Sequence, residues 1–357
     1  MINKETIQEL LDYFQHIEKK DLKFNKEAIE VAFQKNNAQQ SLAIKVLSIF
    51  GGLLASIAFF GFFYITGLYN SELGLLVFGI LFITSAFLIN INNEKLMLDA
   101  VSVSLFIIGG ILFGMGLAKL EITNNGISIA FMIIAILSIF IGRNYILTFI
   151  SVLIFNGAII ALILSNNNYE LIHLYISAHA VLITYFFLKE AKIITINKSL
   201  SKLYNPIRIG LIFSFIGGLA LITINGITHL SPQYIWISSV INIAFTIYVL
   251  SHLFELLNIT QTKYKIGIYV ISILLLVPTA LSPAISGAIL IILLSFLVNY
   301  KTAFVIGIIA LIYFISQYYY DLNFTLLTKS ILLFSSGVLF LLLYLFTHKN
   351  LTQNEKI

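Results

Sequence analysis

The chain has 357 residues, of which 59% are apolar and 10% are charged, and it contains no cysteine. A soluble domain carries about 25% charged residues, so this composition leaves too few charges to cover a surface in water. The missing cysteines exclude disulfides and thiolate chemistry. The net charge of +5 is not a nucleic-acid signal, because residues 1–45 are neutral and the excess lies among apolar segments. We therefore predict an all-α polytopic membrane protein that contacts the lipid bilayer and takes no nucleic acid and no cofactor.

Residues 1–45 are predicted to form a short helical segment in the cytoplasm. Within them, residues 4–19 place their apolar side chains on one stripe, which is typical of an amphipathic helix. The segment either rests on the protein or the lipid interface, or it docks a partner.

Apolar runs separated by short polar breaks begin at Val46. About 20 residues cross the hydrocarbon layer, so the runs predict about twelve spans. These are 46–68, 73–92, 98–118, 127–142, 145–165, 170–189, 209–228, 233–254, 266–281, 282–299, 302–320 and 325–347. The count falls if Pro283 only kinks one broken segment.

A basic cytoplasmic loop at 190–208 is predicted to separate two transmembrane halves, 46–189 and 209–347, and residues 348–357 form a cytoplasmic tail. With the N-terminus in the cytoplasm, the outer loops contain one basic residue, Lys119. The inner loops and the C-terminus contain Lys95, Arg143, Lys189, Lys192, Lys198, Lys202, Arg208, Lys263, Lys265, Lys301, Lys349 and Lys356. This bias predicts a bacterial inner-membrane protein with both termini cytoplasmic.

Motifs for catalysis are missing from the sequence, which has no nucleophile elbow, phosphate-binding loop or His-Glu-x-x-His pair. We predict no enzymatic activity, no catalytic residue and no metal site. Gly109, Gly110 and Gly114 let another helix approach the third span closely. His179 is the titratable residue nearest a span centre, and it is either a hydrogen-bonded core histidine or a proton relay or metal ligand. His252 and Glu255 share a helix face, and their spacing suits a metal as well as the hydrogen-bonded pair that we predict.

A polar cluster is predicted at the outer corner between the last two spans. Lys329 lies about five residues into the final span, and Asp321 precedes it in the turn. Gln317 and the three tyrosines Tyr318, Tyr319 and Tyr320 close the span before. Lys329 either snorkels to the interface or binds Asp321, a tyrosine hydroxyl, an anionic head group or an acidic residue of a partner.

The stretch Tyr318-Tyr319-Tyr320-Asp321-Leu322, followed by Thr325-Leu326-Leu327-Thr328-Lys329-Ser330, resembles the hallmark of a bacterial membrane family known as domain of unknown function 4401. The region around Pro278 and Pro283, with the polar turn at Asn299, is similar to that family as well. The resemblance implies a multi-span membrane architecture and no particular activity.

Two functions follow as hypotheses. The first is a non-enzymatic membrane subunit or scaffold for a partner membrane protein. The second is a secondary transporter or flippase for a weakly charged or lipid-like substrate, suggested by the six-plus-six division. A wide cavity reaching the midplane favours the transporter, and a tightly packed bundle with an exposed apolar face favours the scaffold.

Overall fold

A computed structural model describes residues 67–92, 96–141, 145–224 and 230–321, with isolated positions between 47 and 65 and between 327 and 341. All regular elements in this part of the chain are helices. They are η1 (Leu68–Asn70), α4 (Glu72–Asn92), α5 (Leu96–Lys119), α6 (Asn124–Ile141), α7 (Tyr145–Ser165), α8 (Leu171–Leu188), α9 (Glu190–Ile196), α10 (Lys198–Thr223), η2 (Pro232–Tyr234), α11 (Ile235–Leu256), α12 (Thr262–Leu276), η3 (Val277–Leu281), α13 (Pro283–Leu297) and α14 (Lys301–Asp321).

Nine helices of the described residues are long and apolar enough to cross a membrane, and α13 is a shorter apolar helix. Each predicted span from 73–92 to 302–320 coincides with a helix, the span at 266–281 being α12 together with η3. The predicted spans 46–68 and 325–347, the segment 1–45 and the tail 348–357 lie largely or wholly outside the described residues. A total of twelve spans therefore stays a prediction.

Residues 190–208, predicted as a basic loop between the two transmembrane halves, are helical in the structure. This region is the short helix α9 and the first turns of α10, with one extended residue, Asn197, between them. The lysines suggested a solvated connection, but Tyr204 and Arg208 are buried against neighbouring helices. Burial of these side chains stabilises a helix that hydropathy alone does not predict.

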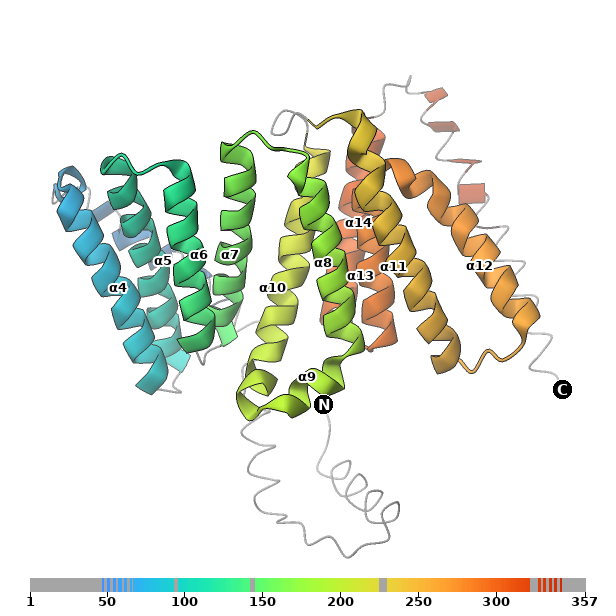
Figure 1. Cartoon of the computed structure of the whole chain (residues 1–357), viewed down its shortest axis with the longest axis horizontal. Coiled ribbons are helices and arrows are strands. Elements are labelled where there is room, and N and C mark those ends of the chain that lie inside the picture. The colour runs from blue at the N-terminus through green and yellow to red at the C-terminus, as the bar shows by residue number, and fades with distance from the viewer. Residues whose placement is uncertain are drawn as a thin grey trace, which may run out of the picture.

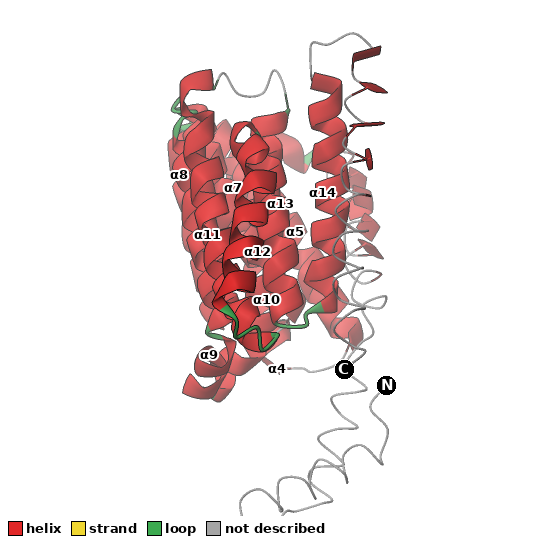
Figure 2. Ribbon diagram, turned by 90° about the vertical axis from the view of Figure 1, so that its right-hand side faces the viewer, coloured by secondary structure: helices red, strands yellow, loops and turns green. Residues whose placement is uncertain are grey.

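The helices run roughly parallel and form a broad row, with α4 to α7 on one side and α12 at the opposite edge (Figure 1). Viewed from that edge, α13 lies between α11 and α14 (Figure 2). The largest core joins α7, α8, α10, α11, α13 and α14 through side chains such as Ile176, Phe215 and Phe314. The helix α8 packs mainly against α10, α11 and α13, so the packing is continuous across 190–208.

Glycines set the closest helix contacts in the bundle. A Cβ atom at Gly109 would lie 2.9 Å from the carbonyl oxygen of Gly79, so α5 and α4 touch backbone to backbone there. On the adjacent face of α5, a Cβ at Gly114 would lie 3.1 Å from the ring of Phe131 on α6, and one at Gly110 would lie 3.7 Å from it. The three glycines therefore seat α5 between two neighbours.

Four helices end on a residue in the left-handed conformation. The residues are Asn167, Asn258 and Asn299, with φ of 56°, 52° and 53°, and Glu121, with φ of 58°. The next amide donates to a carbonyl five residues back, as Tyr300 N does to Ser295 O at 2.8 Å. These are Schellman caps, and asparagine tolerates their strained position better than most residues.

Candidate functional site

The predicted outer corner is only partly within the described residues. Gln317 Nε2 approaches both carboxylate oxygens of Asp321 at 3.4 Å, one turn apart on α14. The rings of Tyr319 and Tyr320 meet edge to face, with centroids 5.8 Å apart, and Tyr318 is partly exposed. Lys329 lies outside the described residues, so its place in this cluster stays a prediction.

His179 is buried on α8, and its imidazole lies close to a neighbouring tyrosine. The ring centroid lies 4.1 Å from that of Tyr175, and Nδ1 lies 2.9 Å from the Tyr175 carbonyl oxygen. The Tyr175 hydroxyl donates to the Ser214 carbonyl of α10 at 3.2 Å. Since a carbonyl only accepts, Nδ1 carries the proton, and the arrangement suits a neutral core histidine.

His252 does not direct its Nδ1 toward Glu255. Nδ1 lies 3.3 Å from both the Tyr248 carbonyl oxygen and the Ser251 hydroxyl, and the ring meets that of Tyr248 edge to face at 4.8 Å. The i, i+3 spacing of His252 and Glu255 therefore indicated a shared helix face, but the two side chains do not form the predicted pair.

A buried arginine forms the first cluster that the sequence did not indicate. Arg208 on α10 is 4% exposed, and its Nη1 donates to Glu190 Oε2 at 3.0 Å. Its Nη2 donates to Asn205 Oδ1 at 2.6 Å. The ring centroids of Tyr300 and Tyr204 lie 3.7 and 4.8 Å from the guanidinium carbon. Flat stacking on aromatic faces with a carboxylate partner is an arrangement that suits arginine and not lysine.

The Arg208 cluster connects elements that are distant in sequence. Glu190 opens α9, Tyr204 and Arg208 lie one turn apart on α10, and Tyr300 directly precedes α14. The Tyr204 hydroxyl donates to the Phe186 carbonyl of α8 at 2.8 Å. Burial raises the pKa of the Tyr300 phenol above its ordinary value, although the guanidinium opposes this shift. The phenol therefore stays neutral, and the cluster joins α8, α9, α10 and α14 at one end of the bundle.

A second unexpected cluster lies at the opposite end, where α8 begins. His173 is 2% exposed, and its Nδ1 lies 3.0 Å from Ser238 Oγ on α11. Its Nε2 faces Glu170 Oε2 at 3.9 Å, while Glu170 Oε1 accepts the backbone N–H of Ser231 at 3.0 Å. The connectivity is that of a carboxylate–histidine–serine triad. Ser238 is completely buried, however, so no substrate carbonyl can approach its oxygen.

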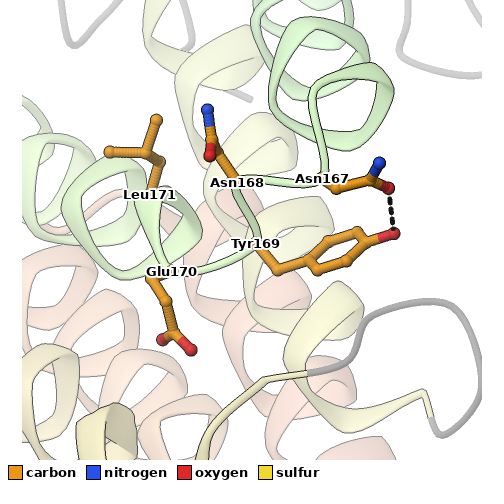
Figure 3. A pocket seen from close by; sticks show the side chains of 5 residues that line it. All are labelled: Asn167, Asn168, Tyr169, Glu170 and Leu171. Atoms are coloured by element: carbon orange, nitrogen blue, oxygen red, sulfur yellow. Dashed lines mark hydrogen bonds between the residues drawn. The ribbon is translucent and has the colours of Figure 1, made fainter.

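An open hollow adjoins this second cluster. It is lined by Asn167, Asn168, Tyr169, Glu170 and Leu171, the turn that leads into α8. Figure 3 shows the Tyr169 hydroxyl bonded to Asn167, at 2.8 Å, and the Glu170 carboxylate turned away from that pair. Glu170 is therefore a residue of the hollow's lining, and 40% of its side chain is exposed.

Polar groups continue inward along α11. Asn242 Nδ2 donates to the Pro283 carbonyl at 3.2 Å, where α13 begins, and lies 3.5 Å from Ser286 Oγ. Ser239 and Asn242 are completely buried, and neither Ser239 Oγ nor Asn242 Oδ1 has a hydrogen-bond partner among the described residues. An unpaired polar group in a low-dielectric interior costs free energy, so Ser239 and Asn242 are candidate functional residues.

Together these features define a polytopic helical membrane protein. Its described residues include no group of three or more histidine, aspartate or glutamate side chains that could hold a metal. The model of the family described as "Domain of unknown function (DUF4401)" matches residues 41–349, and the chain belongs to this family. The resemblance predicted from the C-terminal motif is thereby confirmed. No curated protein and no solved structure matches the chain.

Proposed function

We propose that the protein is a non-enzymatic membrane subunit that scaffolds a partner membrane protein. The observation that carries this proposal is α12. Most of its fifteen residues are apolar, yet Leu276 is its only buried side chain, and among the described helices α12 packs chiefly against α11 and η3. The central helices are closely packed, as where a Cβ at Gly287 would lie 2.6 Å from Leu219. A closely packed bundle with one largely exposed apolar helix suits association with another membrane protein better than it suits passage of a substrate.

Charge supports the proposed orientation in a bacterial inner membrane. The end of the bundle that carries α9 has exposed lysines at Lys189, Lys192, Lys202, Lys263 and Lys301, and the half-buried Lys265. The opposite end has Glu72, Glu121, Glu170 and Asp321 with Lys119. By the positive-inside rule, the α9 end is cytoplasmic, and an even number of spans then places both termini there.

A second candidate function, a secondary transporter or flippase, is favoured by one observation. Buried polar groups follow the contact of α8 with α11 and α13, at His173, Ser177, Asn242 and Ser286. Half-helices that begin inside the bundle, as α13 does at Pro283, also occur in transporters.

The test is site-specific photo-crosslinking followed by purification in mild detergent. A photoreactive residue replaces Leu274, which is 66% exposed on α12, and the control replaces Phe140, which is 82% exposed on α6. A scaffold gives one discrete protein adduct from position 274, in stoichiometric yield, and none from position 140. The scaffold proposal fails if both positions label only lipid and the protein purifies alone at every detergent strength.

A further inference from the structure

Two buried polar atoms face each other at the predicted outer end of the bundle. Neither His173 Nε2 nor Glu170 Oε2 has a hydrogen-bond partner among the described residues, and they lie 3.9 Å apart. This distance is too long for a hydrogen bond, but a small rotation of the glutamate closes it. Glu170 is the more open of the two, with 40% of its side chain exposed against 3% for His173.

We propose that Glu170 and His173 form a proton-binding site, which exchanges with water through the hollow lined by Asn167–Leu171. The bound proton comes from water and changes the charge of the pair from −1 to 0. In the protonated state, Nε2–H donates to the Glu170 carboxylate and Nδ1–H donates to Ser238 Oγ. The Ser238 hydroxyl then donates to the Ile235 carbonyl, which lies 3.4 Å away.

This protonated arrangement satisfies the imidazole on both sides. In the neutral ring, one nitrogen carries a lone pair. If that nitrogen is Nε2, the lone pair faces a carboxylate, which is unfavourable. If the lone pair is on Nδ1, the Ser238 hydroxyl must donate to the ring, and it loses its hydrogen bond to the Ile235 carbonyl. Proton uptake removes both conflicts, because the ring then donates from Nε2 to the Glu170 carboxylate and from Nδ1 to Ser238 Oγ.

Among the described residues, no other charged side chain lies beside the pair. The helices packed against α8 are chiefly α10, α11 and α13, and α13 has no charged residue. The charged side chains described on α10 and α11 are Lys202, Arg208 and Glu255, all at the opposite end of the bundle. Glu170, whose Oε2 lies 3.9 Å from Nε2, is accordingly the charged group that faces His173 within the described residues.

The site also connects two segments. Glu170 Oε1 accepts the N–H of Ser231, just before η2 and α11, while His173 bonds Ser238 on α11 itself. A proton that draws Glu170 toward His173 therefore acts on the carboxylate that holds Ser231. The state of the pair and the position of the α11 entrance are coupled through one side chain.

The experiment is a histidine NMR titration of the full-length protein in lipid nanodiscs. The chain has six histidines, and the His173 signal is assigned by its loss in His173→Gln. Over the titrated pH range, the His173 ring should change from the imidazolium pattern at low pH to the neutral pattern at high pH. In Glu170→Gln, the ring should bind the proton at least about tenfold more weakly, because its negative neighbour is gone.

His252, at the other end of the bundle, is the matched reference, and its signal should be the same in both proteins. Glu170→Asp retains a carboxylate and should restore proton binding in part, which separates charge from folding. The proposal is overturned if the wild-type His173 signal stays in one protonation state over the whole range. It is also overturned, in favour of a metal site, if the signal ignores pH but moves when zinc is added at constant pH.

Discussion

The helices α8 and α12 have nearly the same mean hydropathy, 1.8 and 1.9 over Leu171–Leu188 and Thr262–Leu281, but they lie in different surroundings. Ten residues of α8 are buried, whereas α12 buries only Leu276. In Figure 1, α8 lies within the bundle and α12 lies at its edge. Hydropathy therefore shows that a segment can enter the membrane, and it does not show what the segment touches there.

The difference between the two helices lies in their polar and small residues. The buried residues of α8 include His173, Ser177, His179 and Thr184. The middle of α12 is aliphatic, from Val270 to Leu274, apart from one serine. A polar group costs free energy in lipid, and a small one lets a neighbouring helix approach. Polar and small residues thus indicate the protein-facing helix.

The largest expected effect lies at the Arg208 cluster, which fixes α8 and α9 to α10. Arg208→Ala removes the partner of Glu190 and empties the space between Tyr204 and Tyr300. Breaking a buried ion pair costs about 3–5 kcal/mol, and we expect the lower end because 29% of the Glu190 side chain is exposed. Lys263→Ala, at the exposed start of α12, should change the free energy of unfolding by less than about 0.5 kcal/mol.

The measurement is unfolding by SDS from mild detergent micelles, followed by the fluorescence of the single tryptophan, Trp236. Arg208→Lys keeps the charge but loses the planar contacts, so it should fall between wild type and Arg208→Ala. Equal stability of the Arg208→Ala and Lys263→Ala proteins would show that the cluster does not hold α8 in place.

Two glycine substitutions, one in contact with α8 and one on α12, should reproduce the contrast between these helices with a moderate change in the free energy of unfolding. A Cβ at Gly218 on α10 would lie 2.6 Å from the Tyr175 ring of α8, while one at Gly267 on α12 meets nothing within 4 Å. Gly218→Ala should cost about 1–3 kcal/mol through overpacking. Gly267→Ala should stabilise its helix by up to about 1 kcal/mol. The same SDS unfolding assay measures both, and a loss at Gly267 matching that at Gly218 would mean that α12 is packed by protein.

The positions of most described helices were predictable from the sequence, and their neighbours were not. Long apolar runs with polar breaks located the predicted spans because the length needed to cross a bilayer is fixed. The helix α9 and the first turns of α10 were missed because their charged residues suggest solvent. The burial of Arg208 depends on Tyr300, 92 positions further along the chain (300 − 208). The spacing of Glu170 and His173 was visible, but Ser238 comes from α11. Contacts between distant segments decide both sites, and hydropathy carries no information about them.

The smallest effect concerns the turns that lead into the two helices. Asn167 precedes α8 and Asn258 precedes α12, both in the left-handed conformation with φ of 56° and 52°. Replacing either by glycine relieves the same backbone strain and adds the same freedom to the unfolded chain, so these two terms cancel in the comparison.

What remains is the side chain, because Asn167 Oδ1 accepts the Tyr169 hydroxyl at 2.8 Å. An exposed hydrogen bond contributes about 0.5–1 kcal/mol, so Asn167→Gly should be less stable than Asn258→Gly by about that amount. Asn167→Asp keeps an acceptor at this position and should recover most of the loss. Because both substitutions act on equivalent turns, a difference in the opposite direction would mean that the turn before α12 carries the stronger side-chain contacts, and the contrast between the two helices would not extend to their first turns.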